Sequence, residues 1–430
     1  MRILLLGQGA ALHILAWKMV SETAVVEIHC APGNAGTMLL LGPAPFAHLH
    51  ATEIAQWAFA QQVDLVIVQG RPEWVETLTS VALPVLGVGK KEWQALRRNH
   101  QIREELRAHA VPLPPGQAFR TREHAERYIA SRPLPLWLRP NDAAEREIIH
   151  VADRLEAFQQ LARLLGLYPQ DGIYIEEAVD GPEVALGLLS DGEHTISLGV
   201  SHPYDRRHEG ETGPLTEGMG AYAPYGDKSL EERLLQAVGQ PVTKALQAAG
   251  VLRPSFLHLR IVLGPAGPVL RDLAWDLDDL HAAVTLPRWA GDAAGTLYTA
   301  AGGRMEEATV SWKPGIAVAA AVVVENYPRP GPSGQPLPSI YDTPAMVWHH
   351  ATKLTAEREK ASILPAWLRS LTPSPGLGVP SQVLTAGGRV LFVTGYADSA
   401  YEACQQVYQG AAQLAFEHSD WRQDIASELL

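Results

Sequence analysis

The chain has 430 residues, of which 47% are hydrophobic and 19% are charged, and its formal net charge is −12. A chain of this length is expected to form several packed domains, roughly three, rather than a single core. The acidic balance argues against a general nucleic-acid binder or a protein of anionic membranes, since both functions need a basic surface.

The cysteines and the apolar runs further limit the class of protein to which the chain can belong. Cys30 and Cys404 are the only cysteines, and neither stands in a metal-binding or redox spacing. We therefore expect no disulfide scaffold, no cysteine-ligated zinc and a cytoplasmic, reducing location. The apolar run Ile316–Val324 is far shorter than the ~20 residues that span a bilayer, so it predicts a buried strand and no membrane partner.

The first hundred residues alternate short apolar strands with helical stretches. Strands are expected at Ile3–Leu6, Val25–His29, Leu65–Val68 and Val85–Val88, and helices around Leu15–Trp17 and Ile54–Ala60. This order is typical of an open, doubly wound parallel α/β sheet. Ala31–Thr37 follows the second strand, and we expect it to be a loop at the carboxyl edge of the sheet, where ligands collect.

The middle of the chain pairs strands with helices on one face, which indicates an α+β region. Helices are expected from Trp93 through Leu106, near Leu155–Leu164 and at Leu230–Ala249; strands are expected at Pro135–Arg139, Ile173–Glu177, Val184–Leu189, Leu257–Ile261 and Val269–Asp272. The segment Arg329–Pro336 is rich in proline and glycine and predicts an exposed loop or linker. Beyond it, a turn feeds a strand at Thr385–Val393 and a helix follows at Ser399–Leu414.

The segment Glu211–Tyr222 holds glycines at 213, 218 and 220 and a proline at 214. Such a composition predicts a shaped loop rather than a helix or a central strand. Because glycine lets backbone N–H groups approach a ligand, the loop suits a small anionic or amide-bearing substrate. On composition alone, an ordinary structural turn is an equal alternative.

The string Glu-Thr-Gly-Pro-Leu-Thr-Glu-Gly-Met-Gly-Ala-Tyr at 211–222 resembles the substrate loop of glycinamide ribonucleotide synthetase (phosphoribosylamine–glycine ligase), typically Asp-Thr-Gly-Pro-Asn-Thr-Gly-Gly-Met-Gly-Ala-Tyr. Residues 32–37, Pro-Gly-Asn-Ala-Gly-Thr, carry the same string as that family, and the resemblance extends over essentially the whole chain. It implies a doubly wound N-terminal domain, a split ATP-grasp domain and a C-terminal α/β domain, which we expect at 1–92, 93–325 and 326–430. The substrate-binding residues it implies are Gly33, Asn34, Gly36, Arg206, Glu211, Thr212, Gly213, Pro214, Gly218 and Gly220.

The stretch Ile175–Glu183 resembles the family's hinge Ile-Glu-Glu-Phe-Leu-Asp-Gly-Glu-Glu, whose backbone holds adenine and whose last Glu holds ribose. The nucleotide-binding residues that the resemblance implies are Arg139, Glu176, Glu177, Val179 and Glu183. Without it, the favoured interpretation is a strand that ends in an Asp-Gly turn with solvated acids.

The family uses ATP and Mg²⁺, but the matching phosphate and metal positions differ here. The lysine of the family's Gly-Ser-Lys is replaced within Arg98-Asn99-His100, and the glycine-rich flap is replaced by 139–147, which has acids and no glycine. The metal ligands Glu and Asn become Arg271 and Leu273, which offer no oxygen to Mg²⁺. The sequence therefore predicts no metal residues and assigns no catalytic residue. The acids of 272–279 could form a different site, although a half-buried strand with a solvated face is the favoured alternative.

The resemblance predicts a divergent ATP-grasp protein of the purine-biosynthesis ligase type that has lost ligation because its phosphate and metal positions changed together. An active carbon–nitrogen ligase, with the family's substrate or a changed one, is the first alternative. A non-catalytic ligand-binding or interaction protein is the second. We expect a small-molecule ligand, no nucleic-acid partner, and a monomer or weak homodimer.

Overall fold

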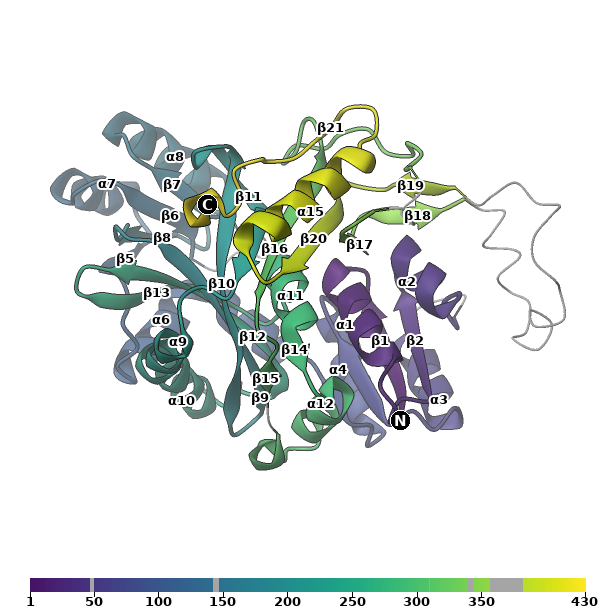
Figure 1. Ribbon diagram of the computed structural model, residues 1–430. Coiled ribbons are helices and arrows are strands. Elements are labelled where there is room, and N and C mark those ends of the chain that lie inside the picture. The colour runs from purple at the N-terminus through teal and green to yellow at the C-terminus, as the bar shows by residue number, and fades with distance from the viewer. Residues whose placement is uncertain (47–49, 142–146, 309, 339–342, 356–381) are drawn as a thin grey trace, which may run out of the picture.

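The computed structural model describes residues 1–46, 50–141, 147–308, 310–338, 343–355 and 382–430 (Figure 1). The N-terminal region is a parallel sheet with strand order β2-β1-β3-β4. Its strands and helices are β1 (Arg2–Gly7), α1 (Ala10–Val20), β2 (Glu27–Pro32), α2 (Ala35–Leu41), α3 (Ala51–Ala60), β3 (Leu65–Val68), α4 (Pro72–Ser80) and β4 (Val85–Leu86).

Alternation along β1 explains why this sheet is buried on both faces. Ile3 and Leu5 belong to a core that includes α1, whereas Leu4 and Leu6 belong to a core that includes α3 and α4. Successive side chains of a strand point to opposite faces, so a continuous apolar run is what a doubly covered strand requires. The predicted open α/β sheet is therefore confirmed.

The second region is an antiparallel sheet of order β5-β8-β6-β7, with helices α7 and α8 packed on it. Its buried residues come from alternate positions of β6 and β8, such as Leu136, Leu138, Ile173 and Ile175. Its elements, with the two helices that precede it, are α5 (Lys90–Arg97), α6 (Asn99–Ala108), β5 (Gly116–Phe119), α7 (Arg122–Ser131), β6 (Leu136–Pro140), β7 (Ile149–Val151), α8 (Arg154–Leu167) and β8 (Ile173–Glu177).

The largest sheet is antiparallel and has the order β13-β12-β9-β10-β11-β16-β20-β17, with β21 beside β16. Its strands are β9 (Glu183–Asp191), β10 (Thr195–His208), β11 (Thr212–Ala223), β12 (Pro254–Gly264), β13 (Gly267–Ala274), β16 (Ile316–Val324), β17 (Met346–His349), β20 (Arg389–Ala397) and β21 (Ser419–Asp420). Two short ribbons pair β14 (Trp289–Ala290) with β15 (Ser311–Trp312) and β18 (Thr352–Leu354) with β19 (Val383–Thr385). Because β16 pairs with both β11 and β20, the expected second and third domains share one sheet. The expected bounds at 92 and 325 stay a prediction.

Helices cover this sheet on both faces. Near one end, α6 and α10 bury apolar side chains against β9 and β12, and α15 lies along β16 and β20 (Figure 1). The remaining helical elements are α9 (Lys228–Leu234), the π-turn η1 (Leu235–Gly239), α10 (Gln240–Ala248), α11 (Asp279–Thr285), η2 (Leu286–Arg288), α12 (Ala293–Ala301), η3 (Met305–Glu307), α15 (Ala400–Gln413) and η4 (Ser427–Leu429). In the described part of the chain, no helix has both the length and the apolar character that crossing a bilayer demands.

The segment predicted as a shaped loop, Glu211–Tyr222, lies almost wholly in strand β11, so that prediction is wrong. Gly220 stands opposite Tyr204 in β10 and Ala320 in β16. A Cβ at position 220 would lie 2.5 Å from Cδ1 of Ile425. The glycine therefore permits close packing of neighbouring segments, which is the use that a strand makes of glycine.

The irregular features of this segment are confined to a bulge and to the tip of the hairpin. Residues 216–219 stand opposite Asp205 alone, which makes an extended bulge in β11. Gly218 in that bulge has φ +106°, a conformation that favours glycine. Pro214 lies in the part of β11 that pairs only with β10, where its missing N–H removes no bond to a second neighbour.

Two other predicted segments also differ. In Ala31–Thr37, the strand continues to Pro32 and α2 begins at Ala35, so the expected loop is only two residues long. In 272–279, the half-buried strand ends at Ala274, and the later acids lead into α11.

Candidate functional site

A cavity of about 950 Å³ lies where the N-terminal sheet, strands β11 to β13 and the C-terminal region meet. We call it the central cavity. Its walls combine two turns at the carboxyl edge of the parallel sheet, part of β11 near its bulge, the end of β13 with the segment that leads into α11, and Arg389 of β20. The residues that line the central cavity are Gly7, Gln8, Gly9, Gln69, Gly70, Arg71, Ile148, Asp205, Leu215, Thr216, Glu217, His258, Arg260, Arg271, Asp272, Leu273, Ala274, Asp276, Leu277, Asp278, Asp279, Tyr327, Pro328 and Arg389.

The charged groups of the central cavity are mostly acidic. Six carboxylates face four arginines in its walls. A triphosphate would therefore meet more negative than positive charge, and this opposes its binding. A small ligand with charges of both signs meets no such penalty.

Two of the arginines are held by a ring of ion pairs. Nε of Arg260 lies 2.6 Å from Oε1 of Glu183, and Nη2 of Arg271 lies 2.8 Å from the same oxygen. Asp205 closes the ring through Arg260 and lies 3.7 Å from Nη2 of Arg271. Burial raises the pKa of Asp205. Burial also opposes ionisation of Glu183, but the two arginines hold the pKa of this carboxyl below its usual range.

A second set of ion pairs surrounds the buried carboxylate of Glu176. The Glu176 carboxylate is fully buried and accepts hydrogen bonds from Arg103, at 3.2 Å, and from Arg139. Arg139 also lies 3.6 Å from Asp272, and Nη2 of Arg103 donates to the carbonyl of Arg271 at 2.9 Å. We call these contacts the Glu176 network.

The Glu176 network lies between two cavities, since Arg271 and Asp272 also line the central cavity. The other cavity, between α6 and β13, has a volume of only about 20 Å³ and is lined by Arg103 and Asp272 among others. Of the other hinge residues, Glu177 pairs with Arg132 at 3.2 Å, and Val179 packs against Gly264. The backbone N–H groups of Glu177 and Ala178 donate to the carbonyls of Pro115 and Pro135.

The acids of 276–279 serve the protein's own structure in part. Asp278 caps α11 by accepting from the N–H of His281 at 2.9 Å. Asp279 accepts from the N–H of Ala11 at 2.7 Å, in the first turn of α1, and pairs with His350 at 3.1 Å. Within the described ranges, no three His, Cys, Asp or Glu side chains are grouped as a metal site.

Gly33, Asn34 and Gly36 do not line the central cavity. Asn34 is buried and caps α2, and its amide donates to the carbonyls of Gln8, at 2.9 Å, and His349, at 2.8 Å. A Cβ at Gly36 would lie within 2.7 Å of both His13 and His349. These residues support the cavity wall at Gln8 and join the N-terminal region to β17.

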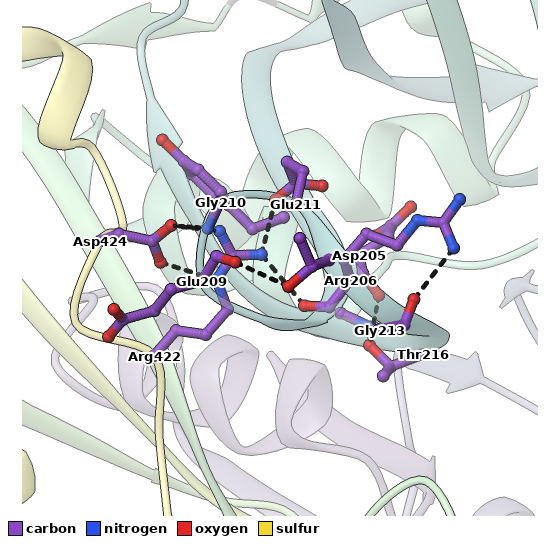
Figure 2. A network of polar contacts seen from close by, with 12 residues as sticks. Asp205, Arg206, Glu209, Gly210, Glu211, Gly213, Thr216, Arg422 and Asp424 are labelled. Atoms are coloured by element: carbon purple, nitrogen blue, oxygen red, sulfur yellow. Dashed lines mark hydrogen bonds and ion pairs between the residues drawn. The ribbon is translucent and has the colours of Figure 1, made fainter.

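The hairpin tip of β10 and β11 is fastened by the C-terminal segment, as Figure 2 shows. Arg422 is 2% exposed and donates to Glu211 at 2.5 Å and to Asp424 at 2.7 Å. Arg206 donates to the carbonyl of Gly213 at 3.0 Å, and the hydroxyl of Thr212 donates to the carbonyl of Glu209. Neither side chain faces the central cavity, and Glu211, Gly213, Pro214, Gly218 and Gly220 are also absent from its walls.

The structure thus separates the residues implied as substrate contacts from the cavity, while the segment Leu215–Glu217, which lies between them in sequence, does line it. The sequence interpretation missed Arg71, Arg260 and Arg389 as wall residues. Arg389 donates to the carbonyl of Glu217 at 2.6 Å, across 172 residues of sequence. No local pattern signals a contact of that separation.

Comparisons with known proteins agree along the whole chain. Three family models match: the N domain of phosphoribosylglycinamide synthetase at residues 1–90, its ATP-grasp (A) domain at 100–279 and its C domain at 317–428. The chain is 26% identical to a phosphoribosylamine–glycine ligase of Streptomyces coelicolor, covering 100% of this chain and 99% of the relative. It is 27% identical to the ligase of Escherichia coli, covering 99% and 98%.

Among solved structures, the fold is similar to that of a phosphoribosylamine–glycine ligase from Thermotoga maritima, with a TM-score of 0.80 and 18% identity over 99% of this chain and 100% of that one. It is also similar to the biotin carboxylase domain of a Hydrogenobacter thermophilus 2-oxoglutarate carboxylase in complex with MgADP, with a TM-score of 0.67 and 13% identity over 97% and 91%.

Proposed function

Because the chain belongs to the phosphoribosylglycinamide synthetase family of ATP-grasp ligases, we propose that it keeps the family's scaffold and a ligand-binding central cavity but has lost ATP-dependent ligation. The family's role is in purine biosynthesis, and family membership implies ATP and Mg²⁺. The residues present here fit neither group.

The Glu176 network carries this proposal. The resemblance places adenine and ribose at the hinge that contains Glu176 and Glu183, with Arg139 at the phosphates. In this chain these side chains are held in ion pairs with one another and with neighbouring arginines: Glu176 with the buried Arg103 and Arg139, and Glu183 with the partly buried Arg260 and Arg271. Ribose at Glu183 and phosphate at Arg139 would have to compete with these ion pairs, and breaking a buried ion pair costs about 3–5 kcal/mol. The hinge backbone, which holds adenine in the family, is also engaged here, because the N–H groups of Glu177 and Ala178 donate to the carbonyls of Pro115 and Pro135.

The metal position offers a second argument. Mg²⁺ needs oxygen ligands in near-octahedral order. At the two positions where the family has such ligands, the side chains are Arg271, which pairs with Glu183, and Leu273. A guanidinium group there adds a cation that repels the metal. Loss of the metal position and of the phosphate position together removes the charge neutralisation that phosphoryl transfer requires.

For the ligand of the central cavity we propose a small ribosyl or amino-acid-like molecule with groups of both charge signs. Paired arginines and carboxylates around a polar cavity of about 950 Å³ suit such a molecule better than a polyanion. Of the four wall arginines, Arg71 and Arg389 belong to neither ion-pair set; Arg71 lies 3.7 Å from Glu73, and Arg389 pairs with Glu217 at 3.0 Å.

The proposal predicts no ADP release above the uncatalysed rate when ATP, Mg²⁺, phosphoribosylamine and glycine are supplied together. Release of ADP is measured in a coupled assay, with the Thermotoga maritima ligase as the active control under the same conditions. Turnover in the usual range of enzymes, ~1–10³ s⁻¹, would revive the first alternative, an active carbon–nitrogen ligase.

A further inference from the structure

A second cavity, separate from the central one, lies beside the middle of β10 and the C-terminal end of β11, next to η4. Its volume is about 490 Å³. We call it the aromatic cavity, and its main lining side chains are His202, Tyr222, Pro224, Tyr225, Glu428 and Leu429. None of its residues lines the central cavity, so a ligand of the aromatic cavity is independent of the proposed function.

Three aromatic rings stand together in this wall. The rings of His202 and Tyr225 are stacked, with centroids 5.4 Å apart and an interplanar angle of 26°. Tyr222 stands 5.4 Å from His202 and 6.0 Å from Tyr225. The stack covers one face of the His202 ring and one face of the Tyr225 ring and leaves the other two faces free of each other. Aromatic faces carry negative electrostatic potential, which attracts a cation.

The same cavity has a carboxylate. Glu428 accepts hydrogen bonds from the hydroxyl of Tyr204, which lies at 2.7 and 2.8 Å from its two oxygens. Burial and the nearby Glu428 raise the pKa of Tyr204 and of Tyr222, so both phenols stay neutral and their hydroxyls keep their protons. Glu428 is the one carboxylate among the described lining residues of this cavity.

No lysine or arginine among the described lining residues balances the charge of Glu428. The nearest ring nitrogen, Nε2 of His202, is 3.8 Å from Oε1 of Glu428, while Nδ1 of the same ring donates to the carbonyl of Glu183 at 2.7 Å. Arg422 packs over Tyr204 at 5.0 Å but is bound to Glu211 and Asp424. The described lining residues thus offer rings and a carboxylate with no lysine or arginine between them.

We propose that the aromatic cavity binds an alkylammonium group. The rings supply cation–π attraction, Glu428 supplies an opposite charge, and Pro224 and Leu429 supply apolar contact for the alkyl part. An anion would be repelled by Glu428, and no lysine or arginine among the described lining residues offsets that repulsion, so a phosphate or carboxylate ligand is disfavoured. The group can belong to a free amine or to a lysine side chain of another protein, since both present the same chemistry.

The test is a calorimetric titration of the full chain with three probes: tetramethylammonium, n-butylammonium and Nα-acetyl-lysine amide, with acetate as the anionic control. We expect saturable binding of at least one cationic probe and none of acetate. Tightest binding of a free amine identifies a small-molecule ligand, whereas tightest binding of the lysine derivative identifies a protein side chain. Absence of saturable binding of every cation up to about 10 mM, or equal binding of acetate, overturns the proposal.

Variants assign the binding to this cavity. Tyr225→Leu and Glu428→Gln are each expected to weaken it by about tenfold, while Tyr225→Phe, which keeps the ring, retains it. Tyr401→Ala is the matched control, because Tyr401 is 61% exposed on α15 and does not line the cavity. The melting temperature of each variant is measured first, to show that it is folded. Equal affinities for wild type, Tyr225→Leu and Glu428→Gln overturn the proposal.

Discussion

Replacing Glu176 by glutamine should lower the free energy of unfolding by about 3 kcal/mol or more. Glu176 has no exposed surface, and its two partners, Arg103 and Arg139, are 4% and 3% exposed. Removal of the carboxylate charge leaves two buried guanidinium groups beside a neutral amide, and an uncompensated buried charge is more costly than the lost pair alone. The loss is measured from chemical denaturation curves at neutral pH.

The neighbouring residue gives the control. Glu177 also pairs with an arginine, but Arg132 is 44% exposed, so Glu177→Gln should change the free energy of unfolding by less than about 1 kcal/mol. The two substitutions are chemically identical and adjacent in sequence. Equal losses of stability in the two variants would show that the buried ion pairs of Glu176 stabilise the fold no more than the exposed pair of Glu177.

The protein should lose stability steeply as the pH falls below 6.5, because neutral histidines are buried between the N-terminal region and β17. Burial lowers the pKa of His13 to about 4, and burial together with His13 lowers that of His349 to about 3. Their ordinary value is 6.5. A group whose pKa is lower in the folded chain stabilises the fold above its unfolded pKa, and this stabilisation disappears as the pH approaches the folded pKa.

At pH 5 each of these two histidines should contribute about 2 kcal/mol less than at pH 7.5. Denaturation midpoints at the two pH values measure the combined loss of stabilisation from His13 and His349. Tryptophan fluorescence reports whether the region around His13 unfolds. The ring centroids of Trp17 and Trp348 are 5.1 Å apart, and that of His13 lies 5.8 Å from that of Trp348. The difference should be smaller in His13→Asn, which keeps an acceptor for the N–H of His349 but cannot take up a proton.

His418→Gln is the control for the acid effect, since the His418 side chain is 57% exposed. It should leave the pH dependence unchanged. Because burial also lowers the pKa of His281, to about 3, some acid sensitivity should persist in the His13 variant. A flat stability profile from pH 7.5 to 5 in the wild type would contradict the burial of these imidazoles.

Apolar patterning predicted the regular elements well. The strands Leu65–Val68, Ile173–Glu177 and Ile316–Val324 have the bounds that the sequence indicates, because each is a short run that both faces of a covered sheet can bury. The prediction was wrong at Glu211–Tyr222. The glycine content of this segment suggested a loop with a freely chosen backbone conformation. In the structure, Gly220 is needed because the side chain of Ile425 packs against its backbone. That neighbour is far away along the chain and cannot be inferred locally.

The charged site was predictable only where the family resemblance supplied positions. The change of metal ligands to Arg271 and Leu273 is visible in the sequence, but the partners of Arg271 are not. Arg103 meets Glu176 across 73 residues, and Arg389 meets Glu217 across 172. Ion pairs between residues so far apart in sequence depend on how the sheets pack together. The ion pairs that engage the hinge residues Glu176 and Glu183 could therefore not be predicted from the sequence.

The central claim is that this chain's own ion pairs occupy the place of the nucleotide. Calorimetric titration of the full chain with ATP in the presence of Mg²⁺ tests it most directly, with the Thermotoga maritima ligase titrated alongside. We predict no saturable heat up to about 1 mM ATP for this chain. Binding with a Kd in the micromolar range would contradict the claim, because a nucleotide would then be accommodated despite the ion pairs of Glu176 and Glu183.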